Sequence, residues 1–194
     1  MGSIFTSSCA VRPINNANGS VTQVDNVSKE RTVASQPIKP DKGKRCAARA
    51  YANVGQDDDF DPECYALQLR LVKGAEKGDL VQMTKALKNG AHPNGSVFDQ
   101  LYPPLYTAVS FGQSDAVCFL LDNGANINQG SWFVGTPVFV AARTGQTEIL
   151  KILLERGANV CLQADGGTAE DFARQGGYTE IVELLKTARK ARCK

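Results

Sequence analysis

The chain has 194 residues, of which 42% are apolar and 22% charged, with a formal net charge of +2. These values are typical of one compact soluble domain with a tail, and they exclude wholesale binding to nucleic acid through net charge. No run of about eighteen apolar residues occurs, and the N-terminus lacks both a basic region and an apolar core. The sequence therefore predicts neither a membrane span nor a secretory signal.

The first six residues match a lipidation motif. Removal of Met1 leaves Gly2 with a free amine, and Thr6 fills the Ser/Thr position of the N-myristoylation pattern. One myristoyl chain binds membranes only marginally, so a second signal is expected. Palmitoylation of Cys9 or the basic cluster in residues 39–49 would supply it, although this cluster also fits a solvated linker or a nuclear-import signal.

The cysteines are scattered, and no two have the close spacing of a zinc site or a redox dithiol. We therefore expect reduced thiols and a cytoplasmic protein, peripheral on the cytosolic face of a membrane. The alternative is a soluble protein of the nucleus and cytosol. The six cysteines are Cys9, Cys46, Cys64, Cys118, Cys161 and Cys193.

The composition divides the chain into residues 1–61 and 62–194. Residues 1–61 are rich in Ser, Asn, Gly, Lys and Asp and have no helical or strand periodicity, which predicts a disordered tail. Asp61 and Pro62 then predict a helix start, because the carboxylate can cap free N–H groups and Pro suits the first helical turn.

From this point the sequence repeats with a period near 33 residues. The turn glycines Gly78, Gly112, Gly145 and Gly177 are 34, 33 and 32 residues apart, which indicates one supersecondary unit used four times. In the clearest unit, Thr136-Pro137 predicts a capped short helix that ends at Gly145.

A second helix is expected to follow in the same unit and to end at Gly157 in a left-handed conformation. Its apolar residues are spaced by three and four, so they predict a broad apolar stripe that only a stacked neighbour can bury. These residues are Ile149, Leu150, Ile152, Leu153 and Leu154.

Residues 65–190 resemble ankyrin repeats, in about four copies of which the end copies are degenerate. The resemblance rests on Thr136-Pro137, Ala141-Ala142, Gly145, Leu153-Leu154 and Gly157-Ala158-Asn159. It implies an all-α solenoid of helix-turn-helix repeats joined by β-hairpin loops, and a module that binds a protein partner. The basic residues that end the chain, from Lys186 to Lys194, are expected to complement the dipole of the last helix.

Aromatic residues occupy loop tips that are usually polar in ankyrin repeats. Such side chains are typical of binding hot spots, and Phe111, before Gly112, is expected on the same concave side. The alternative is that they fold against a neighbouring hairpin or the tail. The candidate partner-binding residues are Trp132, Phe133, Phe98, Tyr102 and Phe111.

An enzyme is not expected, because the parts of a catalytic site are missing from the sequence. His92 is the single histidine and lies in a turn between helices, where a structural role is expected. No phosphate-binding loop occurs, so we predict no catalytic residue, metal, cofactor or small-molecule substrate, and no nucleic-acid partner.

Three functions fit these observations. The first is a protein-binding adaptor tethered to the cytosolic face of a membrane through myristoylated Gly2 and a second signal. The second is a soluble inhibitory regulator that masks a partner such as a kinase or a transcription factor. The third is a pathogen effector that its host acylates.

Overall fold

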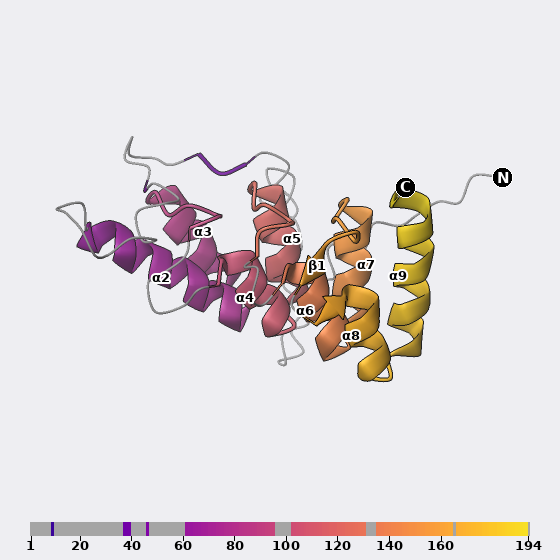
Figure 1. The fold of residues 1–194 in the computed structure, drawn as a ribbon. Coiled ribbons are helices and arrows are strands. Elements are labelled where there is room, and N and C mark those ends of the chain that lie inside the picture. Colours follow the sequence, from indigo (N-terminus) through magenta and orange to yellow (C-terminus); the bar gives the residue numbers. More distant parts are fainter. Residues whose placement is uncertain are drawn as a thin grey trace, which may run out of the picture.

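The computed structural model describes residues 9, 37–39, 46, 61–95, 102–130, 135–164 and 166–193. Within them the chain forms four helix pairs that stand side by side in chain order (Figure 1). The first helices of the pairs form an inner row: α2 (Pro62–Lys77), α4 (Pro104–Ser110), α6 (Pro137–Thr144) and α8 (Ala169–Gln175). The second helices form an outer row: α3 (Leu80–Lys88), α5 (Ser114–Asp122), α7 (Thr147–Glu155) and α9 (Thr179–Arg192).

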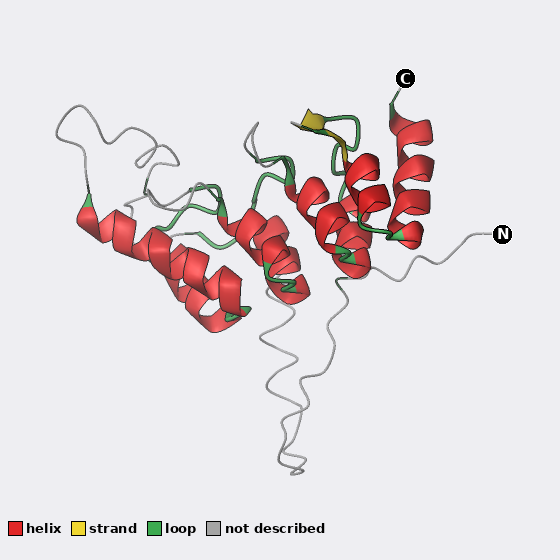
Figure 2. Ribbon diagram, turned by 60° about the horizontal axis from the view of Figure 1, so that its bottom comes forward, coloured by secondary structure: helices red, strands yellow, loops and turns green. Residues whose placement is uncertain are grey.

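Each row stacks through contacts between consecutive members, α2 with α4 and α4 with α6 in the inner row, α5 with α7 and α7 with α9 in the outer. The strands β1 (Gln163–Ala164) and β2 (Gly167–Thr168) form an antiparallel hairpin in the last connection between pairs (Figure 2). Helices supply nearly all the regular structure of the described residues. The predicted all-α solenoid is confirmed.

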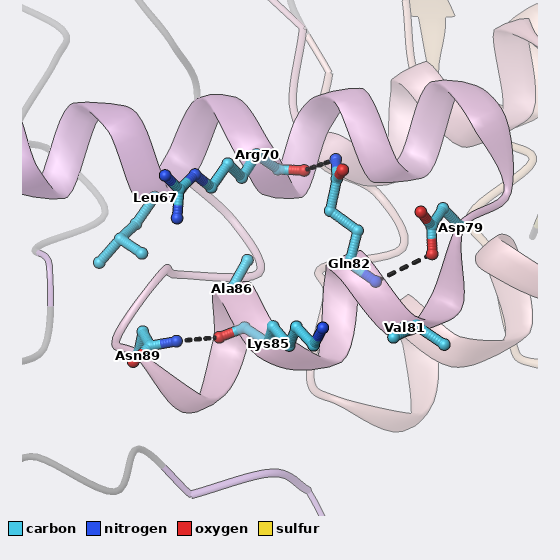
Figure 3. A pocket seen from close by; sticks show the side chains of 8 residues that line it. All are labelled: Leu67, Arg70, Asp79, Val81, Gln82, Lys85, Ala86 and Asn89. Atoms are coloured by element: carbon cyan, nitrogen blue, oxygen red, sulfur yellow. Dashed lines mark hydrogen bonds between the residues drawn. The ribbon is translucent and has the colours of Figure 1, made fainter.

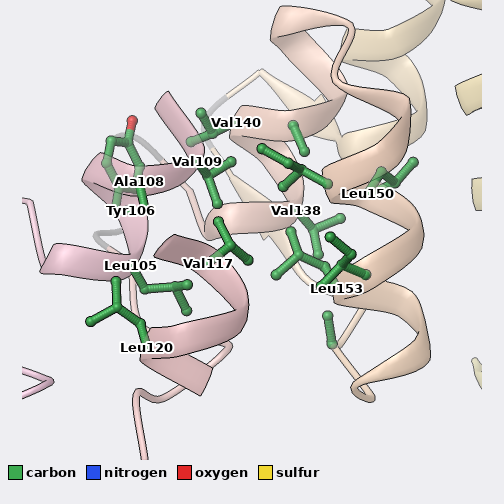
Figure 4. Close-up of a cluster of buried hydrophobic side chains, with 14 of the residues drawn as sticks. Leu105, Tyr106, Ala108, Val109, Val117, Leu120, Val138, Val140, Leu150 and Leu153 are labelled. Carbon is green, nitrogen blue, oxygen red and sulfur yellow. The ribbon is translucent and has the colours of Figure 1, made fainter. Parts of the chain in front are cut away.

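The core runs between the two rows and continues from pair to pair (Figure 4). The five apolar residues predicted to form the stripe on α7 are all buried, as are Ala141 and Ala142 on α6, where short side chains let helices approach closely. Each fully buried Leu or Ile contributes about 1.5–3 kcal/mol, so stacking supplies most of the stability. The second and third pairs meet through Leu105, Val109, Val117, Leu120, Val138, Leu150 and Leu153.

The helix ends confirm one predicted cap and correct another. The Asp61 carboxylate accepts hydrogen bonds from the N–H groups of Glu63 and Cys64, at 3.0 and 3.2 Å, so α2 begins as predicted. Thr136 stands before Pro137 as expected, but its hydroxyl makes no cap bond. That hydroxyl is buried and has no hydrogen-bond partner among the described residues.

The four turn glycines are all in the left-handed region, with φ between 69° and 74°. They lie one above the other along one edge of the stack, at the turns between the inner and outer helices. The residue after each glycine covers the glycine of the preceding pair. A Cβ added at Gly78 would meet the Gln113 side chain at 2.6 Å, and one added at Gly145 would meet the Tyr178 ring. The turns therefore interlock as well as the helices.

The expectation of reduced cysteines is wrong in this structure, because all six form disulfides. The pairs are Cys9–Cys118, Cys46–Cys64 and Cys161–Cys193, with Cα separations of 5.8, 5.5 and 5.6 Å. Their sequence separations are 109, 18 and 32 residues, so folding rather than local spacing brings the partners together. Cys9, a predicted palmitoylation site, has no free thiol in this form.

The predicted disordered tail lies almost wholly outside the described residues. The part that is described, Cys9, residues 37–39 and Cys46, contacts the helix pairs, and Cys9 and Ile38 pack against the core. Gly2 lies outside the described residues. In the described part of the chain, no helix has both the length and the apolar character that crossing a membrane requires.

Candidate protein-binding surface

Phe111 is an exposed aromatic in a row of otherwise small or polar residues. The position before each turn glycine holds Lys77, Phe111, Thr144 and Gly176 in successive pairs. Phe111 is the C-cap of α4, with 56% of its surface exposed. More than half of the Phe111 surface is exposed, so the ring contributes little to packing. Among these four positions, Phe111 is the one large apolar side chain and thus a candidate anchor for a partner.

An open groove runs beside Phe111, between the turn of the second pair and that of the third. Its far wall is the start of α7, and its floor includes Gly112 and Gly145. Polar groups line the rest: Ser110, Ser114, Gln146, Thr147 and Glu148. An apolar ring beside convergent polar groups is suited to hold a side chain of a partner.

Tyr102 lies at the opposite end of α4 from Phe111. Its ring stacks on that of Tyr106, with centroids 4.6 Å apart and an interplanar angle of 10°. Tyr106 is buried, and this burial raises the pKa of its hydroxyl, although the positive charge of Arg143 opposes the shift. Since α4 has seven residues, about 10 Å of helix separates Tyr102 from Phe111. The structure thus places them at opposite ends of α4 rather than in one patch.

The remaining predicted anchors are Phe98, Trp132 and Phe133. All three lie outside the described residues, in the connections that precede α4 and α6. Their role in binding stays a prediction.

His92 has the structural role expected of it. Its backbone N–H donates to the Gln68 amide oxygen at 3.0 Å, and its ring Nδ1 accepts from the Asn94 N–H at 3.1 Å. No cluster of three or more potential metal ligands occurs in the described part of the chain.

Asparagine side chains link successive pairs through the loops that follow the outer helices. Asn94 Oδ1 accepts from the Asn126 N–H at 2.6 Å, and Asn128 Oδ1 accepts from the Asn159 N–H at 2.8 Å. The sequence analysis missed this ladder, although the recurring Gly-Ala-X-X-Asn of the first two pairs was its signal. Such bonds join the loop ends of neighbouring pairs and so stabilise the stack on which the candidate surface lies.

Residues 105–193 match the family model for ankyrin repeats, in three copies. Residues 105–193 are therefore ankyrin repeats. The matched region covers the pairs from α4/α5 to α8/α9, and α2/α3 precedes it as a further helix pair stacked on α4. A comparison with curated proteins finds no match.

The first helix pair, which lies at the end of the solenoid, has a groove between α2 and α3 (Figure 3). Here the Gln82 amide donates to the Arg70 carbonyl at 2.8 Å, and Asp79 caps α3 through the Gln82 N–H at 2.9 Å. Val81 is 65% exposed, and Lys85 adds a positive charge. An exposed apolar side chain is ordinary at a solenoid end, so this groove is a weaker candidate than the Phe111 surface.

Ankyrin repeats support a role in protein–protein interaction, and the family is typically non-enzymatic. The described residues agree with the first role because they combine a stack of helix pairs with an exposed aromatic side chain, Phe111. The surface around Phe111, within the matched ankyrin repeats, is therefore the candidate site.

Proposed function

We propose that this ankyrin-repeat protein is a non-enzymatic adaptor that binds a partner protein at the Phe111 surface and is held at a membrane by an N-myristoyl group on Gly2. The observation that carries the binding role is the exposed Phe111 ring beside an open groove on an ankyrin solenoid. The motif at Gly2 supports the anchor.

Phe111 is the residue on which to test the binding role. Truncation to Ala should weaken partner binding by at least about 2 kcal/mol, the size of a hot-spot contact, because the ring is the one large apolar group in its row. The melting temperature should hardly move, since the ring is exposed. Val81→Ala is the matched control, because Val81 is also exposed and apolar but lies on α3.

The partner for this measurement is obtained by crosslinking to the full chain in cells, followed by purification and titration. Equal affinity of the wild-type, Phe111→Ala and Val81→Ala proteins would refute the assignment of this surface.

Gly2 is the residue on which to test the anchor. Cells fed an alkyne-tagged myristate should label the wild-type chain and the Ser3→Ala control but not Gly2→Ala. The wild type should sediment with membranes and Gly2→Ala should stay soluble, because the acceptor amine or its recognition is lost.

The second signal has a structural consequence. In the disulfide-bonded form the Cys9 sulfur is bonded to Cys118 and cannot be palmitoylated. The basic cluster at residues 39–49 is then the remaining candidate for the second membrane-binding signal. If Gly2→Ala distributes like the wild type, the anchor is wrong, and the soluble regulator that masks a kinase or a transcription factor takes its place.

A further inference from the structure

Two separate attachments join the N-terminal segment to the ankyrin repeats. The first is the Cys9–Cys118 disulfide, which links it to the outer helix α5. Both cysteines are half-buried, and Cys9 packs against the core.

The second attachment uses residues 37–39 and Cys46. The Ile38 N–H donates to Asn123 Oδ1, at the end of α5, at 2.8 Å, and the Ile38 side chain packs against the core. The Cys46 N–H donates to the Gly90 carbonyl at 3.0 Å, and Cys46 is bonded to Cys64 in the first turn of α2. This disulfide is buried, with 2% and 4% of its two residues exposed.

The disulfides of the two attachments differ in how easily a reductant would open them. Cys46–Cys64 closes a short loop. Its Cys46 end is also held by the hydrogen bond to Gly90 and its Cys64 end lies in α2, so the two thiols would stay close together after reduction. Cys9 is 29 residues from Ile38, the nearest described attachment point, so the chain length alone would let its thiol separate from Cys118 after reduction. Greater exposure also gives a reductant better access to Cys9–Cys118.

We propose that Cys9–Cys118 is a redox-controlled tether that fixes the N-terminus against α5 when oxidised and releases it when a dithiol reduces it. While the bond is closed, the seven residues from Gly2 to Cys9 limit the reach of Gly2 to about 25 Å from Cys9. After reduction, the 35 residues from Gly2 to Pro37 allow about 120 Å, with the second attachment still in place.

The reaction is a thiol–disulfide exchange with a dithiol reductant of the thioredoxin class. One reductant thiolate attacks a sulfur of the Cys9–Cys118 bond, forms a mixed disulfide and expels the other cysteine as a thiolate. The second reductant thiol then resolves the mixed disulfide. Two electrons and two protons pass to the protein, which gains two thiols, and the reductant becomes a disulfide. Because cytosolic dithiols reduce accessible disulfides, the tether would report the redox state of its surroundings.

The test uses the full-length, non-acylated protein with a fluorophore on its N-terminal amine. Stepped concentrations of dithiothreitol are followed by alkylation and mass mapping of each cysteine, and by fluorescence anisotropy. Cys9 and Cys118 should become alkylated at a dithiothreitol to oxidised-dithiothreitol ratio about tenfold lower than Cys46 and Cys64 require, which is about 30 mV for a two-electron couple. The anisotropy should fall in that same step.

Two variants separate this tether from general loosening of the fold. Cys9→Ser should show low anisotropy at every ratio, whereas Cys161→Ser should keep the wild-type response at the N-terminus. Three results would each overturn the tether: a non-reduced peptide map without Cys9–Cys118, opening of this bond together with or after Cys46–Cys64, or unchanged anisotropy once Cys9 and Cys118 are alkylated. Because no acyl group is present, none of these results depends on the anchor at Gly2.

Discussion

Gln68 is a fully buried polar residue whose amide nitrogen and oxygen are both hydrogen-bonded. Its nitrogen donates to the carbonyls of His92 and Gly95, at 3.0 and 2.7 Å, and its oxygen accepts from the His92 N–H at 3.0 Å. These bonds join α2 to the loop that follows α3. The residue therefore fixes the geometry of the first helix pair, although nothing in its position in the sequence predicts this role.

Gln68→Leu should cost about 2–4 kcal/mol of unfolding free energy, because it leaves buried backbone groups of this loop without partners. Gln82→Leu is the control, since its bond to the Arg70 carbonyl is exposed and water can replace it, with an expected cost below about 1 kcal/mol. Urea unfolding of both variants measures this difference. Similar losses in the two would show that the Gln68 network contributes little.

Trp132 and Phe133 carry the other residue-scale prediction. If they anchor a partner, changing both to Ala should weaken binding by at least about 2 kcal/mol and leave the melting temperature nearly unchanged. If they pack between hairpins, each truncation should instead cost about 3–5 kcal/mol of stability. A melt and a binding titration on the one double variant distinguish the two, and a large fall in melting temperature with normal residual affinity would exclude the anchor role.

At the scale of helices and turns, the left-handed glycines divide into two kinds. Gly145 has a φ of 74° and lies under the Tyr178 ring, whereas Gly157 has a φ of 85° and nothing within 4 Å of an added Cβ. Both require a conformation that disfavours other residues, but only Gly145 is also closely covered.

Gly157→Ala should therefore cost about 1–2 kcal/mol, the strain of a left-handed alanine. Gly145→Ala should cost about 1–3 kcal/mol more, because the methyl group displaces the Tyr178 ring that joins the third and fourth pairs. Chemical denaturation of the two variants gives the comparison. Adding Tyr178→Ala to Gly145→Ala should recover part of the extra loss, and a failure to do so would place its origin elsewhere.

Helix α8 begins with a capping box that the sequence analysis missed. The Thr168 hydroxyl and N–H donate to the Asp171 carboxylate, at 2.6 and 2.9 Å, while the Asp171 N–H donates back to the hydroxyl. These bonds to Thr168, hydroxyl first, lower the pKa of Asp171. The spacing Thr-X-X-Asp was the available signal.

A lowered pKa means that Asp171 stabilises the fold above the usual aspartate range and loses this contribution as the pH falls through its folded pKa. The melting-temperature advantage of the wild type over Asp171→Asn should thus shrink as the pH is lowered below about 4. A Thr168→Val background removes the hydroxyl donor, and there the same comparison should depend less on pH. An advantage that is constant from neutral to acid pH would contradict the assignment.

For the whole molecule, the disulfides and polar clamps act mainly at the ends of the solenoid. Arg192 donates to the carbonyls of Ala158 and Leu154, at 3.1 and 2.9 Å, and the next residue, Cys193, is bonded to Cys161. The basic C-terminus thus complements the end of α7 as well as ending its own helix. A terminal repeat has a neighbour on one side only, so such clamps replace the missing stacking.

Cys161→Ser combined with Cys193→Ser should lower the unfolding free energy by about 2–4 kcal/mol under oxidising conditions, because the unfolded chain regains the entropy of a 32-residue loop. In dithiothreitol the variant and the wild type should unfold almost together, since reduction removes the same bond from both. A difference that persists in the reduced proteins would mean that the substitutions act through packing rather than through the crosslink.

The sequence alone determined the helix pairs, the period of the ankyrin repeats and the turn glycines, because each depends on local spacing and backbone preference. Ile149 and Leu153 follow the helical period, and Gly145 marks a turn that requires a left-handed residue. Tertiary structure alone decided which cysteines form pairs and which of the described aromatic side chains are packed or exposed. Cys9 and Cys118 meet across 109 residues, and Tyr102 stacks on Tyr106 while Phe111 stays exposed. These outcomes depend on which surfaces the stacked pairs bring together, and no local pattern encodes that.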